Sequence, residues 1–145
     1  MATKKYSISK VINANSETLF KIISDFKNYS NWNTVIPVAE GELTKGTELQ
    51  LMMKMNGEPR PFNPTVAMIE MNKSFLLSKV FLSKKIGELT HQFEFKKLAN
   101  NQTEFVQTWE GKGFLVKMMW SKIAQGFQDF EIFNDNLESC LMKHH

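Results

Sequence analysis

Residues 115–141, LVKMMWSKIAQGFQDFEIFNDNLESCL, decide the fold of this chain. Apolar residues recur along this stretch every three or four positions, at Val116, Trp120, Ile123, Phe127, Phe130, Leu137 and Leu141, with one polar step at Asn134. The spacing predicts one helix with a single apolar stripe, roughly 40 Å long at about 1.5 Å per residue. Such a helix needs a broad concave partner, which is either a solid core or the wall of a cavity that holds something apolar.

Length and composition predict one globular domain over residues 1–145. Of the 145 residues, 42% are hydrophobic and 23% are charged, which is typical of a chain that folds around one core. The formal net charge is +3, the lysines are scattered, and Arg60 is the only arginine. Nucleic-acid surfaces concentrate basic residues on one face, so we expect no nucleic-acid partner.

The chain also lacks the signals of a secreted or membrane protein. It has no run of eighteen apolar residues, no apolar leader at its start, and one cysteine, Cys140, which we interpret as a small buried hydrophobic residue. We expect a cytoplasmic protein without an integral membrane segment, as a monomer or homodimer. His144 and His145 are given no chemical role, whether they are native or remain from a purification tag.

The rest of the chain predicts an opening strand, two short helices and a series of short strands. Residues 6–12 alternate as a strand, and Asn15 or Ser16 can cap the helix that follows. Turn residues then separate six expected strands, at 38–43, 47–55, 65–71, 75–82, around 91–95, and 103–110, with an irregular stretch near Pro59 and Pro61. Short connections favour neighbouring antiparallel strands. We therefore expect an α+β fold in which a curved antiparallel sheet of about seven strands wraps around the long C-terminal helix.

Three separated strings carry a resemblance to a known superfamily. They are residues 12–25 with Tyr29 and Trp32-Asn33; His91-Gln92-Phe93-Glu94-Phe95 with residues 103–105 and 109–111; and Phe127 with residues 130–137. Together they resemble the SRPBCC superfamily (START-like, Bet v 1-like, helix-grip), in its polyketide cyclase/dehydrase-type branch. The resemblance covers essentially the whole chain and implies the helix-grip fold. The superfamily includes lipid carriers, hormone receptors, ring cyclases, co-chaperones and quinone-binding proteins, so it does not choose between functions.

An apolar pocket between sheet and helix is the main functional hypothesis, and an ordinary core filled with adaptable side chains is the alternative. Leu51, Met53 and Met55 alternate along one strand and Met68 follows on the next, so we expect them on the concave face. The side chains predicted to bind the ligand are Trp32, Leu51, Met53, Met55, Met68, His91, Phe93, Gln107, Trp109, Ile123, Phe127, Phe130 and Asn134. Asn134 either satisfies a polar spot at the end of the pocket or contacts a polar group of the ligand.

His91 is the one candidate catalytic residue. Facing inward, its imidazole can hydrogen-bond a ligand carbonyl or act as an acid or base near neutral pH; the alternative is a structural histidine. A pairing in which residue numbers sum to about 200 sets His91 opposite Trp109 and Phe95 opposite Phe105. This register turns Glu110 to the other face and disfavours a His91–Glu110 dyad. Arg60 lies in an expected loop, either solvated or placed to bind a carboxylate or phosphate of a ligand.

No cofactor motif or metal-ligand spacing is present, so we predict neither. We expect binding of a lipid-, isoprenoid- or polyketide-like molecule. The alternatives are a polyketide cyclase or dehydratase that uses His91 and Gln107, and a protein-interaction module.

Overall fold

A computed structural model describes residues 3–55 and 57–143. Asn56, which the sequence Asn56-Gly57 predicts to lie in a turn, and the first and last two residues, including His144 and His145, lie outside this range. The elements, in chain order, are β1 (Lys4–Ile12), α1 (Ser16–Ser24), the 3-10 helix η1 (Phe26–Asn31), β2 (Val38–Glu40), β3 (Gln50–Met55), β4 (Glu58–Phe62), β5 (Thr65–Glu70), β6 (Ser74–Val80), β7 (Glu88–Lys97), β8 (Thr103–Lys112), α2 (Phe114–Met118), α3 (Trp120–Phe127) and α4 (Phe130–Lys143).

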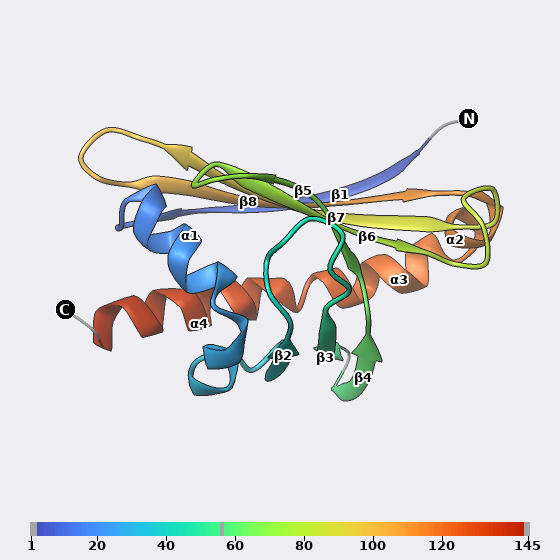
Figure 1. The fold of residues 1–145 in the computed structure, drawn as a ribbon, viewed down its shortest axis with the longest axis horizontal. Helices are drawn as coiled ribbons and strands as arrows, with labels where there is room; N and C mark the ends of the chain where they lie inside the picture. The colour runs from blue at the N-terminus through green and yellow to red at the C-terminus, as the bar shows by residue number, and fades with distance from the viewer. Residues whose placement is uncertain (1–2, 56, 144–145) are drawn as a thin grey trace.

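The strands form two antiparallel sheets around the terminal helices. The larger sheet has five strands in the order β1-β8-β7-β6-β5, and the smaller has three in the order β2-β3-β4. Figure 1 shows α3 and α4 running lengthwise beneath the large sheet, with α1 near the C-terminal end of α4. The expected helix-grip fold is confirmed, but the strands do not form one continuous meander. Pro64 has no N–H to donate where β4 gives way to β5, and an isolated bridge between Glu48 and Thr65 adjoins this break.

Strand β4 lies in the stretch that we expected to be irregular. Pro59 and Pro61 pair with Lys54 and Met52 of β3, although proline disfavours sheets. Their position is tolerated because β4 is the edge strand of the small sheet, where a missing N–H interrupts no further ladder. Arg60 is therefore part of a strand and does not belong to a loop.

The apolar stripe of the C-terminal segment faces the interior as predicted, with Trp120 and Ile123 partly buried, but the helix is divided into three segments. Turns at Met119 and at 128–129 separate α2, α3 and α4. At the second turn the backbone tightens, since the Asp129 N–H donates to the Gly126 carbonyl over 3.1 Å. Gly126 also lets α3 approach β3 closely, because a Cβ placed there would lie 3.3 Å from Met55.

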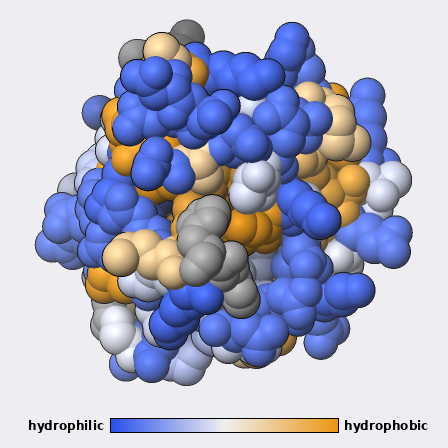
Figure 2. All heavy atoms as spheres, turned by 90° about the vertical axis from the view of Figure 1, so that its left-hand side faces the viewer, coloured by the Kyte–Doolittle hydropathy of each residue, from blue (hydrophilic) through white to orange (hydrophobic). Residues whose placement is uncertain are grey.

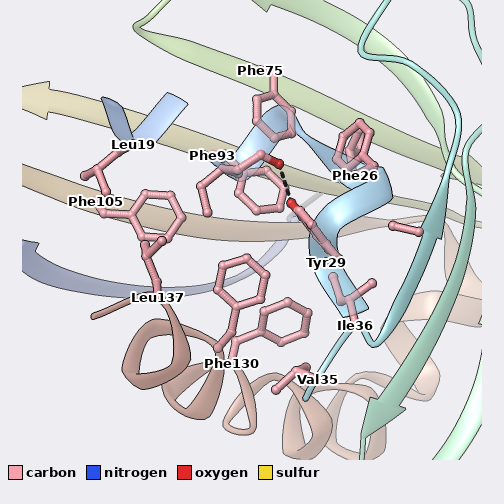
Figure 3. Close-up of a cluster of buried hydrophobic side chains, with 14 of the residues drawn as sticks. Leu19, Phe26, Tyr29, Val35, Ile36, Phe75, Phe93, Phe105, Phe130 and Leu137 are labelled. Atoms are coloured by element: carbon pink, nitrogen blue, oxygen red, sulfur yellow. Dashed lines mark hydrogen bonds between the residues drawn. The ribbon is translucent and has the colours of Figure 1, made fainter. Parts of the chain in front are cut away.

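The first helix begins at the cap that the sequence predicts. The side chain of Asn15 caps α1 by accepting a hydrogen bond of 2.8 Å from the Thr18 N–H. Tyr29 is buried, and its hydroxyl donates to the Ile23 carbonyl, which fastens η1 to α1 (Figure 3).

One part of the interior is a dense aromatic core. Figure 3 shows Phe75 and Phe93 from the large sheet facing Phe130 and Leu137 of α4, with Tyr29 closing one side. The rings of Phe75 and Phe93 stack at 4.4 Å, and Phe105 is fully buried. On the surface, the end of the molecule near the C-terminus of α4 has a mostly hydrophilic rim with apolar side chains at its centre (Figure 2).

Candidate functional site: an apolar cavity beside His91

A cavity of about 200 Å³ lies between the two sheets and α3. Its lining is mostly apolar: Met53, Met55, Pro61, Phe62, Leu77, Leu89, Trp109, Ile123 and Phe127, with Glu58, Arg60, Thr90 and His91 as the polar members. Glu58 and Arg60 are highly exposed and form an ion pair of 3.3 Å. Small-molecule sites typically combine such an apolar lining with a few polar groups.

His91 is held by aromatic rings within this wall. Its imidazole stacks on Phe93 at 4.0 Å and on Trp109 at 4.3 Å, and Phe130 lies edge-on at 5.3 Å. Phe93 follows two residues later on β7, and Trp109 is the direct partner of His91 on β8. The predicted register is therefore confirmed, and Glu110 pairs with Thr90 on the other face, so no His91–Glu110 dyad forms.

A buried chain of hydrogen bonds runs from His91 to α4. Gln107 Oε1 lies 2.9 Å from His91 Nε2, and Gln107 Nε2 donates to Asn134 Oδ1 over 3.0 Å. Gln107 and Asn134 have no exposed surface, and His91 is 5% exposed. Asn134 Nδ2 is buried without a hydrogen-bond partner in the described part of the chain. The polar step in the helix stripe thus supports the histidine through Gln107.

Burial lowers the pKa of His91 to about 3, opposed by the hydrogen bond to Gln107. The imidazole is therefore neutral at physiological pH, because the apolar rings around it cannot replace the water that a charged ring requires. A neutral ring with so low a pKa can accept or donate hydrogen bonds, but it is a poor general base near pH 7.

Within residues 3–55 and 57–143, no group of three or more His, Cys, Asp or Glu side chains could hold a metal ion. The same residues include no helix long and apolar enough to cross a membrane.

The chain matches a known protein family over most of its length. The family described as polyketide cyclase/dehydrase and lipid transport matches residues 3–139, which is nearly the entire chain. The chain belongs to this family. Membership of the polyketide cyclase/dehydrase and lipid transport family implies a hydrophobic ligand-binding or polyketide cyclase-like role.

Solved structures agree with this family fold. A START superfamily protein from Mycobacterium smegmatis is 20% identical, with a TM-score of 0.76 over 97% of this chain and 99% of that one. The Zhui aromatase/cyclase from Streptomyces sp. R1128 is 10% identical, with a TM-score of 0.74 over 95% and 93%. Norcoclaurine synthase from Thalictrum flavum, in complex with dopamine and hydroxybenzaldehyde, is 14% identical, with a TM-score of 0.74 over 99% and 89%. No curated protein matches the chain.

In this family member, the predicted binding residues fall into three groups. Those that line the cavity are Met53, Met55, His91, Trp109, Ile123 and Phe127. Phe93, Gln107, Phe130 and Asn134 lie behind the wall, where they pack against His91 or continue its hydrogen-bond chain. Trp32, Leu51 and Met68 are not part of the lining.

Each residue of the third group has a structural reason for its position. Met68 is 63% exposed because a bulge between Val66 and Met68 shifts the inward face of β5 from Val66 to Ile69. Trp32 packs against Tyr29 and Phe133 near the other end of the molecule. Leu51 points inward as expected, but it lies within the filled core.

Sequence reasoning missed the part of the lining that β4 contributes. Glu58, Pro61 and Phe62 were not predicted as site residues because the two prolines argue against a strand. Leu77, Leu89 and Thr90 were also missed. The alternation of Phe75 and Leu77 along β6 was the available signal for Leu77, since both side chains are buried.

Proposed function

We propose that the cavity binds a compact hydrophobic molecule of about one or two fused rings. The observation that carries this proposal is an apolar cavity of about 200 Å³ beside a core that is otherwise tightly packed. An apolar cavity of about 150 Å³ is large enough to hold benzene. The space is therefore large enough for a somewhat larger ring system.

Size distinguishes this ligand from the wider class of lipid-, isoprenoid- and polyketide-like molecules. Drug-sized ligands occupy pockets of about 300–1,000 Å³, so a long acyl or isoprenoid chain would require the walls to move apart. The monocyclic dopamine and hydroxybenzaldehyde held by the structurally similar norcoclaurine synthase support a compact ligand.

Binding is favoured over catalysis by the state of His91. A cyclase or dehydratase needs convergent groups that exchange protons near neutral pH. His91 has its pKa lowered to about 3, and its polar partners Gln107 and Asn134 are amides that do not titrate. The other charged groups of the lining, Glu58 and Arg60, are paired with each other at its exposed edge.

Mass spectrometry of molecules extracted from natively purified protein is the first test. We expect a compact apolar molecule in stoichiometric amount, and protein that is purified empty should bind indene saturably at one site. The matched control is Ile123→Phe, which fills the cavity from α3 and should abolish indene binding. Empty protein that binds neither indene nor naphthalene would overturn the proposed function.

A further inference from the structure

The orientation of the Gln107 amide determines which nitrogen of His91 carries hydrogen. Gln107 Nε2 donates to Asn134 Oδ1, so the amide oxygen is the atom that faces His91. An amide oxygen can only accept a hydrogen bond. The hydrogen on this side must therefore belong to His91 Nε2, and in a neutral imidazole the other nitrogen, Nδ1, is a bare acceptor.

The imidazole of His91 has one polar atom without a partner in the described residues. Phe93 and Trp109 are nearly parallel to the imidazole, with interplanar angles of 26° and 27°, at distances so short that they must cover opposite faces. Gln107 occupies Nε2. Phe130 lies edge-on at 5.3 Å, and His91 still lines the cavity, so Nδ1 is the one polar atom of the ring that is left for a ligand. Nδ1 has no hydrogen bond within the described residues.

We propose that the ligand carries a hydrogen-bond donor, a hydroxyl or a ring N–H, and that it donates this hydrogen to Nδ1 of His91. The inference rests on the proposed binding function and narrows its ligand class to compact hydrophobic molecules with such a donor. It reverses the carbonyl contact expected from the sequence, because Nδ1 has no hydrogen to offer a carbonyl.

Other polar groups of the cavity do not replace this acceptor. The hydroxyl of Thr90 lies 3.4 Å from the Glu110 carbonyl, and the Glu58 carboxylate is paired with Arg60 at the exposed edge. Burial also keeps the His91 ring neutral through its lowered pKa, so Nδ1 stays free of hydrogen at physiological pH. The unpaired Asn134 Nδ2 carries a free-energy cost, but it lies at the other end of the His91–Gln107–Asn134 hydrogen-bond chain, away from the ligand.

Three isosteric bicyclic probes test the inference by calorimetric titration. Indole presents an N–H donor, benzofuran an oxygen acceptor in the same position, and indene neither. We expect indole to bind roughly five- to tenfold more tightly than benzofuran, since one hydrogen bond forms with indole and two lone pairs oppose each other with benzofuran. His91→Phe should abolish this preference while all three probes still bind. Lys10→Met, on the surface of β1 and outside the cavity lining, should retain it.

The outcomes separate the two proposals. Equal binding of indole and benzofuran, or a preference for benzofuran, overturns the donor inference and leaves the binding function intact. Failure of all three probes to bind overturns both.

A measurement on the free protein tests the tautomer independently of any ligand. Long-range ¹H–¹⁵N correlation spectra of the histidine rings should show His91 protonated at Nε2 and bare at Nδ1. A hydrogen on Nδ1 would mean that the Gln107 and Asn134 amides are reversed, and it would overturn the inference. Gln107→Glu, which replaces the amide by an acceptor, should preserve the Nε2–H tautomer.

Discussion

The interior of this protein has two halves that differ in packing although they share the same sheet and the same terminal helices. In the filled half, Phe75, Phe93, Phe95, Phe105, Phe133 and Leu137 are almost fully buried and none lines the cavity. In the open half, Met53, Met55, Leu77, Leu89, Ile123 and Phe127 surround an empty volume of about 200 Å³. His91, Gln107 and Asn134 lie along the border between them.

The difference follows from the side chains at paired positions. In the filled half, phenylalanines stand opposite one another, as Phe95 does to Phe105 and Phe75 does to Phe93, and their rings pack together between the sheet and α4. In the open half, Leu89 stands opposite Gly111, so no pair of rings interlocks there, and Val116 and Trp120 fill the space over the glycine. The same concave surface is solid at one end and hollow at the other, and the binding of an apolar molecule in the hollow end stays a prediction.

Truncation in the filled half should produce the largest effect. Phe105→Ala removes a fully buried ring and should lower the free energy of unfolding by about 3–5 kcal/mol, measured by urea denaturation. Leu89→Ala, at the wall of the cavity, should cost only about 1–2 kcal/mol because its side chain is half-buried and already borders empty space. Similar losses for the two variants would contradict the division into halves.

Enlarging a side chain should distinguish the halves in the opposite sense. Leu137→Phe inserts volume into the filled half and should destabilise the protein by about 1–3 kcal/mol. Ile123→Phe, on the neighbouring helix α3, should change stability by less than about 1 kcal/mol, since the cavity accepts the added atoms. Thermal unfolding measures both, and a greater loss in Ile123→Phe would show that the open half is not hollow.

His91, at the border between the two halves, should make the free energy of unfolding depend on pH. The pKa of His91 is about 3 in the folded protein, below the ordinary value of 6.5. Below about pH 6.5 the unfolded chain therefore binds a proton that the folded protein does not bind. The stability contribution of the neutral ring is complete above pH 6.5 and is lost as pH falls toward 3. Between pH 6.5 and about 5.5 the free energy of unfolding should fall by about 1 kcal/mol. His91→Phe should flatten this part of the profile, and an unchanged slope would contradict the burial of a neutral ring.

The smallest effect is expected at the surface of the filled half. Lys10 of β1 forms ion pairs of 3.0 Å with both Asp135 and Glu138 of α4. Lys10→Met should cost about 0.5 kcal/mol, and the loss should shrink in high salt, because all three groups are partly exposed. A loss above about 2 kcal/mol, measured by urea denaturation, would mean that these two ion pairs, rather than the aromatic packing, hold α4 on the sheet.

Much of this arrangement could be predicted from short-range patterns. The apolar period of residues 115–141 predicted the buried stripe, and the numbers summing to about 200 predicted the β7–β8 register residue by residue. Both depend on regular periodicity, which sequence displays directly. The inward positions of Met53, Met55 and His91 follow from the same alternation.

The errors occurred where regular periodicity is interrupted. The bulge in β5 turned Met68 outward, and the prolines of β4 concealed a strand that supplies the cavity with Pro61 and Phe62. The position of the cavity depends on which large and small residues face one another across two sheets, and no local pattern records this. Trp32 was misplaced for the same reason, since one of its partners, Phe133, comes from α4 at the other end of the sequence.

A ¹H–¹³C NMR titration of methyl-labelled protein with indole tests the central claim most directly. The open half carries methyl reporters at Met53, Met55, Leu77, Leu89 and Ile123, and the filled half carries them at Leu19 and Leu137. We predict saturable shifts, together with contacts to the indole protons, at the methyl groups of the open half alone. Contacts at the filled-half methyl groups, or shifts that are scattered over the surface and do not saturate, would contradict the claim that the open half is a binding cavity.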